Sequence, residues 1–467
     1  MTITGTERTV GTATLAELAE VLRGELVTSA SDDYDQARSI WNGSHDARPI
    51  AIIRAAGVSD VIRGVEFARS EGLPLAVRGG GHSIPGFSTT DGGVVLDLSP
   101  MKGIRVDPAA RRVVAEAGCL WSDLDHETQA FGLALTGGLV STTGIAGFTL
   151  GGGLGWLVRN CGLTCDSLVG ADLVTADGQL VHASADEHPE LFWALRGGGG
   201  NFGVVTSFEY ALHEVGPTVF AGAVFYPGAA AEQVLAGYRE ACAGAADQLT
   251  TVLNLTTAPP APFLPEAVHG QPVVAILGMW SGATDDGDAA TRPFRQLAEP
   301  IVDLFGPMPY RAMQSLIDPL YPRGLHNYFT STFVPALDED VTQALTTAYR
   351  QVPNPMSELH VHHLGGALGR VPADATAFAV RDQEFIVNAV ARTPAADGFD
   401  AVRTWARTAV AALGAGAAYV NFTGEAAPDR VQAAYPAATY QRLVAVKDRY
   451  DPDNLFCLNQ NIPPSAA

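Results

Sequence analysis

The stretch VRGGGHS at residues 77–83 places three consecutive glycines directly after an apolar, strand-like run, LPLAV at residues 73–77. Glycine has no Cβ and tolerates positive φ, so such a loop turns sharply and brings its backbone close to a bulky ligand. Its bare N–H groups form a concave set of donors suited to phosphate oxygens. Arg78 adds a positive charge, and His82 places a nucleophilic imidazole at the rim. The stretch therefore predicts a strand that ends in a ligand-binding loop.

Two further glycine clusters, at residues 144–155 and 197–203, also lie between strand-like segments. Three such loops predict one long ligand with a pyrophosphate in its middle. Residues 198–203 match the dinucleotide fingerprint G-x-G-x-x-G, which requires a helix to follow. The sequence that follows, VVTSFEYAL at residues 204–212, alternates apolar and polar residues and contains β-branched side chains. It therefore predicts a strand and argues against a Rossmann NAD site.

The composition describes a large, acidic, globular chain. Its 467 residues favour two large units, and the hydrophobic content of 47% provides for a sizeable core. The 29 basic and 50 acidic residues give a net charge of −21, which repels phosphodiester backbones and anionic lipid, so we expect neither nucleic acid nor a membrane as a partner. No apolar run reaches the roughly 18 residues of a membrane helix, and no secretory signal is visible.

The cysteines are few and odd in number, which favours reduced thiols in a cytoplasm over a disulfide framework. Cys161-x-x-x-Cys165 is not a usual zinc spacing and no second ligand pair follows it, so no metal is expected.

The chain alternates short apolar strands with helices, and this predicts an α+β architecture rather than a regular βαβ array. Residues 1–45 read as a helix and a linker, and residues 166–183 as a hairpin that turns at Ala176-Asp177-Gly178. After Pro217, longer alternating segments separated by helices predict a second, antiparallel sheet.

Several segments together resemble a known family: AVRGGGHS at 76–83, DGGVVLDLS at 91–99, TLGGGLGWLVRNCGL at 149–163, RGGGGNFGVVTSFEY at 196–210 and YDPDNLFCLNQNIPP at 450–464. They are similar to the FAD domain of the p-cresol methylhydroxylase (PCMH)/vanillyl-alcohol oxidase superfamily, and most of all to its berberine-bridge-enzyme-like branch. That branch includes bacterial oxidases of sugars, alkaloids and polyketides. The resemblance reaches from about Arg48 to the last residues and is looser between 217 and 417.

The resemblance implies an α+β, two-domain flavoprotein with a discontinuous PCMH-type FAD-binding domain. That domain would comprise residues 1–216, with its core at 47–216, and a C-terminal return at 418–467. Residues 217–417 would form the antiparallel-sheet substrate domain.

The same resemblance implies FAD bound covalently through His82, whose counterpart in the family bonds the flavin 8α-methyl carbon. Such a link raises the flavin potential and prevents loss of the cofactor. The implied cofactor contacts are Arg78, Gly79, Gly80, Gly81, His82, Ser83, Ser141, Thr142, Thr143, Gly144, Gly147, Gly151, Gly152, Gly153, Gly155, Asn201, Val205, Tyr419, Asn421 and Asn459.

Some relatives add a second flavin bond through a cysteine ahead of the second glycine loop. Val140 occupies that position here, and Cys161 and Cys165 lie too far along the chain to replace it. A single 8α-histidyl link is therefore expected.

The customary catalytic bases of the family are missing. Related sugar oxidases carry tyrosine as the last letter of a YxNY motif, which here reads Tyr419-Val420-Asn421-Phe422. Alkaloid-cyclising relatives carry a glutamate where this chain has Arg370. In SELHVHHLGG at 357–366, period-two geometry places Glu358, His360 and His362 on one face. We expect this face to line the substrate cavity, with Glu358 as the base if a pocket raises its pKa.

The candidate catalytic residues are thus Glu358, Tyr419 and Thr143. The expected function is an FAD-dependent oxidase that takes a hydride from a small organic molecule, with O2 as electron acceptor and secondary metabolism as context. One alternative is an oxygenase in which an oxygenated flavin near Thr143 transfers oxygen. Another is a flavin-binding homologue without activity.

Overall fold

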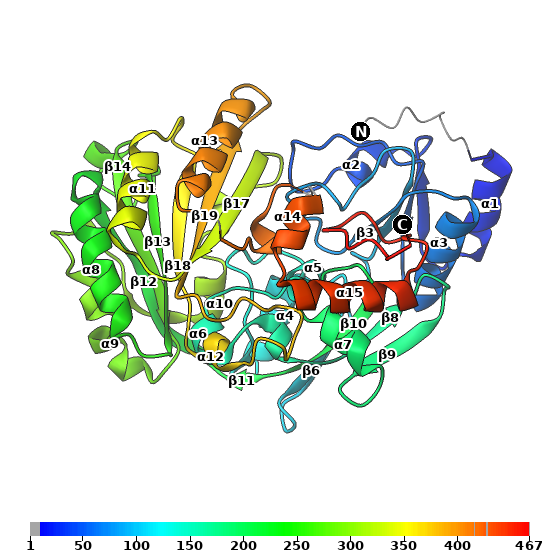
Figure 1. Cartoon of the computed structure of the whole chain (residues 1–467), viewed down its shortest axis with the longest axis horizontal. Coiled ribbons are helices and arrows are strands. Elements are labelled where there is room, and N and C mark those ends of the chain that lie inside the picture. The colour runs from blue at the N-terminus through cyan, green and yellow to red at the C-terminus, as the bar shows by residue number, and fades with distance from the viewer. Residues whose placement is uncertain (1–9, 415, 426–427, 467) are drawn as a thin grey trace.

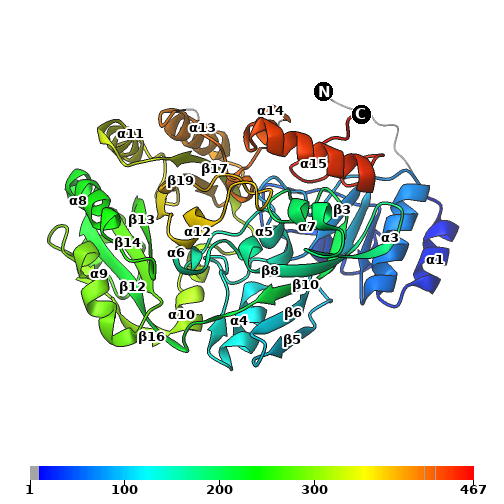
Figure 2. The ribbon, with the colours of Figure 1, turned by 60° about the horizontal axis from the view of Figure 1, so that its bottom comes forward.

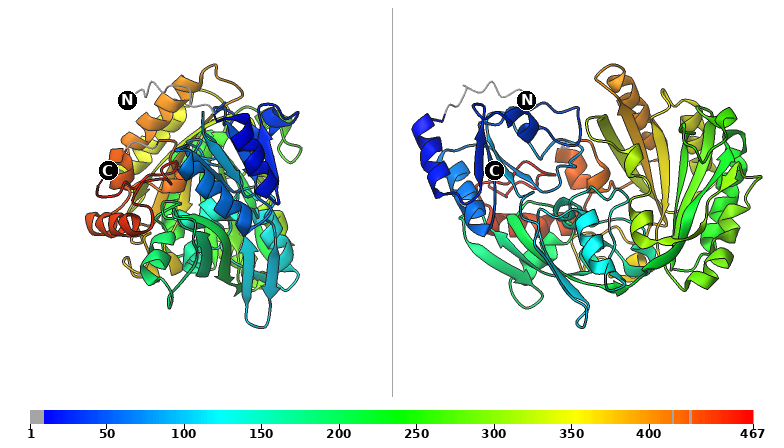
Figure 3. Two further views of the ribbon diagram at one scale, coloured as in Figure 1. Left: turned by 90° about the vertical axis from the view of Figure 1, so that its right-hand side faces the viewer. Right: turned by 180° about the vertical axis from the view of Figure 1, so that it is seen from behind.

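The computed structural model describes residues 10–414, 416–425 and 428–466. These residues fold into two lobes that lie side by side both from the front and from behind (Figures 1 and 3). The N-terminal part and the C-terminal tail share one lobe, and the middle of the chain forms the other (Figure 1). A ligand site between the lobes would therefore draw residues from distant parts of the sequence.

The first lobe begins with a small mixed sheet in the order β1-β2-β4-β3. Its strands are β1 (Glu25–Thr28), β2 (Ala51–Arg54), β3 (Leu75–Arg78) and β4 (Val94–Asp97). β4 pairs in parallel with both β2 and β3, whereas β1 pairs antiparallel with β2. Helix α3 (Val58–Ser70) connects β2 to β3 and buries Val61 and Val65. β3 is thus fixed at the point where the first glycine loop begins.

A second sheet of the same lobe is antiparallel, in the order β5-β6-β10-β8-β9. It contains β5 (Ile104–Asp107), β6 (Arg112–Glu116), β8 (Leu168–Val174), β9 (Leu180–Ser184) and β10 (Val204–Ala211). The expected hairpin is confirmed as β8–β9, and the strand expected after the third glycine loop is β10. The loop is therefore not the start of a Rossmann helix.

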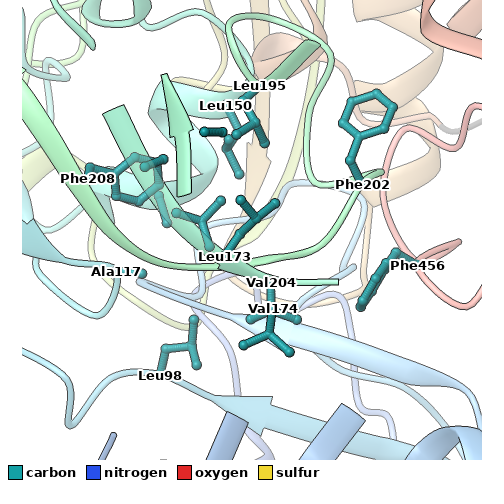
Figure 4. Close-up of a cluster of buried hydrophobic side chains, with 14 of the residues drawn as sticks. Leu98, Ala117, Leu150, Leu173, Val174, Leu195, Phe202, Val204, Phe208 and Phe456 are labelled. Atoms are coloured by element: carbon teal, nitrogen blue, oxygen red, sulfur yellow. The ribbon is translucent and has the colours of Figure 1, made fainter. Parts of the chain in front are cut away.

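The core of this lobe joins both sheets to the tail. Figure 4 shows Leu173 and Val174 of β8, Val204 and Phe208 of β10, and Phe456 of the C-terminal tail in one cluster. Shorter elements complete the lobe: α1 (Thr12–Val21), α2 (Tyr34–Arg38), α4 (Trp121–Gln129), β7 (Leu133–Ala134), α5 (Ile145–Leu150), α6 (Val158–Cys161), α7 (Pro189–Leu195) and β11 (His213–Glu214).

The second lobe is built on a large antiparallel sheet in the order β15-β12-β14-β13-β18-β19-β17, with β16 also paired to β12. Its strands are β12 (Thr218–Pro227), β13 (Leu249–Thr257), β14 (Pro272–Trp280), β15 (Val302–Asp303), β16 (Gly306–Pro309), β17 (His326–Val334), β18 (Glu358–His363) and β19 (Phe385–Thr393). The second antiparallel sheet predicted after Pro217 is thereby confirmed.

The two faces of this sheet have different neighbours. Helices α8 (Ala231–Ala243), α9 (Gly287–Arg295), α11 (Glu339–Arg350) and α13 (Phe399–Ala411) cover the outer face, as Figure 2 shows. Val224 and Tyr226 of β12 pack in the same cluster as α8, whereas Ala223 and Phe225 belong to a cluster on the inner face that includes Trp41 of the first lobe. The inner face therefore meets the first lobe, where α10 (Tyr310–Gln314) packs on α4.

After β19 and α13 the chain returns to the first lobe through α14 (Pro428–Ala433) and α15 (Ala437–Tyr450). Leu443 and Val446 of α15 belong to the core of that lobe. Helix α12 (Ala367–Arg370) lies between β18 and β19 in the sequence and packs beside α6. The domain limits at 216/217 and 417/418 stay a prediction; β12 begins at Thr218.

Among the residues that the structure describes, no helix has both the length and the apolar character needed to cross a membrane.

Candidate active site

A cavity of about 340 Å³ runs from the glycine loops of the first lobe to the inner face of the large sheet. One end is walled by the three glycine loops and by residues 456 and 458–460 of the tail. The other end is walled by side chains of β17, β18 and β19 together with Trp41 and Tyr321. The sequence-predicted residues that line it are Gly79, Gly80, Gly81, His82, Ser83, Thr143, Gly144, Gly147, Gly151, Val205, Asn421 and Asn459.

Arg78 is the first of the predicted contacts that do not line this cavity. Its guanidinium is buried, donates to the carbonyl oxygens of Ser88 and Ala37, and lies 3.6 Å from Asp97. Arg78 therefore supports the base of the first glycine loop, and its expected contact with the cofactor stays a prediction.

The glycines let two loops touch backbone to backbone. A Cβ at Gly80 would stand 2.3 Å from the Gly144 nitrogen, which no side chain tolerates. At Gly147 and Gly200 a Cβ would instead meet no atom within 4 Å, so it would project into the cavity that both residues line. These two bare positions form a cradle that fits a bulky cofactor.

His82 lies in the cavity wall between an aromatic ring and a hydroxyl. Its ring stacks on Trp41 with centroids 4.8 Å apart, and its Nε2 lies 3.2 Å from Thr142 Oγ1. Burial, and secondarily the positive charge of Arg323, lower the pKa of His82 to about 4. The imidazole is therefore neutral at pH 7 and keeps a nucleophilic nitrogen.

The segment before the second glycine loop is tied to the opposite lobe. Ser141 donates through its backbone nitrogen (2.8 Å) and its Oγ (2.6 Å) to the carboxylate of Asp318. Ser141 and Thr142 thus support the loop, whereas Val140 and Thr143 line the cavity. Burial raises the pKa of the Cys161 thiol to about 12 and also holds that of Cys165 well above its usual value, so neither is a ready thiolate.

Tyr419 is a structural anchor for the second loop. Its buried hydroxyl accepts hydrogen bonds from the backbone nitrogens of Gly153 (2.9 Å) and Leu154 (3.2 Å) and from Asn421 Nδ2 (2.9 Å). Burial raises the pKa of Tyr419 above the ordinary tyrosine value. This hydroxyl does not line the cavity within the described residues, and the expected role of Tyr419 in catalysis or cofactor binding stays a prediction.

Asn201 likewise braces the third loop rather than lining the cavity. It donates to Gly198 O and Gln460 O, and its Oδ1 accepts from the Ile462 nitrogen. Gly152, Gly153 and Gly155 also lie outside the lining. Asn459, by contrast, lines the cavity with a buried Oδ1 that has no hydrogen-bond partner among the described residues.

On β18 the predicted shared face is confirmed, but the predicted state of Glu358 is wrong. Arg392 Nη2 (2.8 Å) and Tyr321 Oη (2.9 Å) donate to Glu358 Oε1, and His360 Nε2 lies 3.3 Å from the same oxygen. Burial pushes the pKa of Glu358 upward, but Arg392, His360 and Tyr321 together hold it well below its usual range. Glu358 is thus a fixed carboxylate and a poor proton acceptor near neutral pH.

Sequence reasoning did not find the other residues of this end: Trp41, Ile317, Tyr321, Phe329, Asn388, Val390 and Arg392. Phe329, Asn388, Val390 and Arg392 lie in strands and the other three in loops or turns, and no motif in the sequence marks any of them as part of a site. His360 and His362 both line the cavity, next to Phe422.

Comparisons with known proteins agree with this geometry. A family model described as FAD binding domain matches residues 49–184, and one described as berberine and berberine like matches residues 418–463. An FAD-linked oxidoreductase of Dictyostelium discoideum is 32% identical over 455 residues, with 96% of each chain covered. (R)-6-hydroxynicotine oxidase of Paenarthrobacter nicotinovorans is 31% identical over 460 residues, which cover 96% of this chain and 98% of that one.

Solved structures share the whole architecture. The crystal structure of 6-hydroxy-D-nicotine oxidase from Arthrobacter nicotinovorans matches with a TM-score of 0.86 at 29% identity, covering 95% of this chain and 98% of that one. A moss protein, Physcomitrella patens BBE-like 1, matches with a TM-score of 0.84 at 22% identity, covering 94% and 97%. The mixed α and antiparallel-sheet fold expected from the sequence is thereby confirmed, and the chain belongs to the berberine-bridge-enzyme-like FAD-linked oxidoreductases.

Proposed function

We propose that the chain is an FAD-dependent oxidase that removes a hydride from a small organic molecule and passes the electrons to O2. The observation that carries this proposal is the single cavity that joins the glycine loops to the histidine-bearing face of β18. When bound, FAD supplies the hydride acceptor, and its two electrons then reduce O2 to H2O2.

The residues present fit this cofactor. Gly147 and Gly200 leave room for it, and the unpartnered Oδ1 of Asn459 offers an acceptor for its polar edge. We propose His82 as the single covalent attachment point, because its neutral imidazole lines the cavity and Val140 stands where some relatives have a cysteine. The five cysteines are all free thiols, which supports the cytoplasm as the proposed compartment.

The substrate end favours a largely apolar or aromatic molecule over a sugar. Ile317, Phe329, Val390 and Phe422 supply apolar walls, and few polar groups interrupt them. A relative that by its name oxidises 6-hydroxynicotine supports this class. Secondary metabolism is the proposed context.

Anaerobic screening tests the proposal. The purified protein is mixed without oxygen with aromatic alcohols, cyclic amines and oligosaccharides while the visible flavin band is followed. At least one apolar or aromatic compound should bleach the band, and O2 should restore it with one H2O2 per cycle. Bleaching by oligosaccharides alone contradicts the substrate class, and bound flavin that no compound bleaches favours the inactive homologue.

Isotope-labelled O2 separates the oxidase from an oxygenase acting near Thr143, which lines the cavity. We expect the label in H2O2 and not in the organic product. Label in the product would instead show oxygen transfer, and Thr143→Val, which keeps the shape but removes the hydroxyl, should then change the reoxidation spectrum.

A further inference from the structure

We propose that His360 takes the hydroxyl proton of the substrate, that Glu358 positions it, and that the reacting group is a carbon-bound alcohol flanked by apolar surface. This inference rests on the proposed function and deepens it by naming the proton acceptor and the reacting group.

The first support is the place of His360 in the large sheet. β18 lies between β13 and β19, and His360 is in register with Asn254 on one side and Asn388 on the other. Residues in register share a face of the sheet, and both His360 and Asn388 line the cavity. His360 is therefore held in the rigid middle of a sheet, where a proton acceptor keeps its position.

The second support is the group that orients the ring. The Glu358 carboxylate is ionised and only accepts hydrogen bonds, so the neighbouring His360 Nε2, 3.3 Å from Oε1, carries the ring proton. Nδ1 is then the nitrogen with a free lone pair, and within the described part of the chain it has no hydrogen-bond partner. A carboxylate that fixes one ring nitrogen also stabilises the imidazolium that forms when the other takes a proton.

Glu358 is itself immobilised from the far side. Arg392 donates to Met356 O and Leu320 O as well as to Glu358, and its guanidinium lies 4.4 Å from the centroid of the Tyr321 ring. Arg392 balances the charge of Glu358, so the cluster is neutral before the reaction and gains one positive charge when His360 is protonated. The pair thus serves to position His360 and does not consume the proton.

His362 is the competing candidate, two residues along the same face. Its Nε2 is buried without a partner among the described residues, and burial together with His360 lowers its pKa to about 3. An imidazole that resists protonation so strongly is a hydrogen-bond acceptor for the substrate, and a poor proton acceptor at neutral pH.

The side chains that line the cavity around His360 restrict the chemical class of the reacting group. No charged side chain among the described lining residues faces His360 from the apolar side formed by Ile317, Phe329 and Phe422. A substrate that ionises before it reacts would have to be buried there unpaired, at high cost. An alcohol avoids this cost because it stays neutral until its O–H and C–H bonds break together.

In that step the O–H bond breaks and its proton goes to His360 Nδ1. The C–H bond breaks and the hydrogen leaves with both electrons as a hydride, for which FAD would supply the acceptor when bound, while a C=O bond forms. The substrate is oxidised by two electrons, and the proton later passes from Nδ1 to solvent.

The test uses 4-nitrophenol, whose phenol and phenolate forms differ in colour. A proton acceptor in the cavity should bind it as phenolate, so the apparent pKa of the bound probe should fall by at least one unit in the flavin-loaded wild-type protein. His360→Gln retains a donor for Glu358 but has no basic nitrogen, and it should abolish this shift. Glu358→Gln should reduce the shift by a smaller amount, which a merely structural role would not do.

The matched control is His363→Gln, the same change on the opposite face of β18, where His363 contacts Arg159 and Phe385. It should keep the full shift. An unshifted wild-type titration, a full shift in His360→Gln, or a shift that is lost only in His362→Gln overturns the assignment. Flavin reduction by aromatic alcohols is measured separately; in His360→Gln it should slow by on the order of 10²–10⁴-fold. A protein that shows the probe shift but that no alcohol reduces contradicts the proposed oxidase function, not the proton acceptor.

Discussion

His82 illustrates how the surroundings of one residue prepare its chemistry. A histidine that is to form a bond to carbon must be neutral and held still, and both conditions are met by burial, by the Trp41 ring and by Thr142. The glycine-rich motif indicated His82 from the sequence alone. Trp41, which stacks on it, lies 41 positions earlier, and nothing in its local sequence indicates this contact.

The proposed covalent link through His82 predicts how the flavin partitions in acid. Wild-type protein precipitated with acid should keep its flavin in the pellet, whereas His82→Ala should release it into the supernatant because the bonding nitrogen is gone. His126→Ala, an exposed histidine on α4, serves as the control and should keep the flavin. Wild-type flavin found wholly in the supernatant would disprove the link.

Glu358 supports a prediction of stability as well as of chemistry. Glu358→Gln leaves the guanidinium of Arg392 buried without its counter-charge, so the free energy of unfolding should fall by about 3–5 kcal/mol. Denaturant unfolding of the flavin-loaded protein measures this change. Glu232→Gln removes an exposed partner of Arg350 and should cost at most about 1 kcal/mol. Equal stability of both variants would show that the Glu358–Arg392 pair is not the constraint we describe.

At the scale of elements, β18 separates what the sequence predicts from what it does not. The alternation in ELHVHH places Glu358, His360 and His362 on one face, because side chains of a strand alternate. Arg392, the partner that keeps Glu358 ionised, lies on β19, 34 positions away in the sequence. The order of strands in a sheet cannot be deduced from the local sequence. The sequence therefore indicated that these side chains share a face, but not that the pKa of Glu358 is lowered.

The N-terminal region shows the same limit. Residues 1–45 were expected to be a helix and a linker, but Glu25–Thr28 form β1, which pairs with β2 at the edge of the first sheet. Four residues are too few to show a periodicity. Their strand character comes from pairing with Ala51–Arg54, which is a tertiary effect.

The tail elements support a prediction about cofactor retention. Lys447 of α15 is fully buried, donates to Asp451 Oδ2 (2.6 Å), and also donates to Asn201 O in the third glycine loop and to Phe456 O. Lys447→Met leaves Asp451 buried and unpaired, at a cost of about 3–5 kcal/mol, and loosens that loop. The ratio of flavin to protein absorbance should fall and the tail should be cleaved faster by proteases. Lys102→Met, at an exposed ion pair, is the control. An unchanged ratio in Lys447→Met would contradict the role of the tail.

At the scale of the whole molecule, the site exists only where the two lobes meet. The glycine loops come from one lobe and the histidines of β18 from the other, and Ser141 and Asp318 join the two directly across 177 positions of sequence. The family motifs in the sequence therefore indicated the glycine-loop half of the cavity. The shape of the other half depends on how the large sheet packs against the first lobe.

Buried titratable groups in both lobes make the stability of the molecule depend on pH. Burial lowers the pKa of His362 and His363 from 6.5 to about 3. Below pH 6.5 the unfolded chain therefore binds protons at these two side chains that the folded chain does not bind. Their contribution to stability is present above pH 6.5 and is lost as the pH falls. Asp125 acts in the opposite direction, because burial raises its pKa from 3.8 to about 7 and the folded chain then binds the extra proton.

Burial also lowers the pKa of His82 and His213, so the histidines outnumber Asp125 and stability is lost on acidification, by up to about 1.4 kcal/mol per pH unit for each unopposed group. Denaturant midpoints measured between pH 6.5 and 4.5 should therefore fall with the pH. Asp125→Asn removes the opposing group and should steepen the dependence, whereas His363→Gln removes one of these histidines and should flatten it. If acidification stabilises the wild type, or if the two variants change the slope in the same direction, the three side chains are not buried in the states that the fold assigns to them.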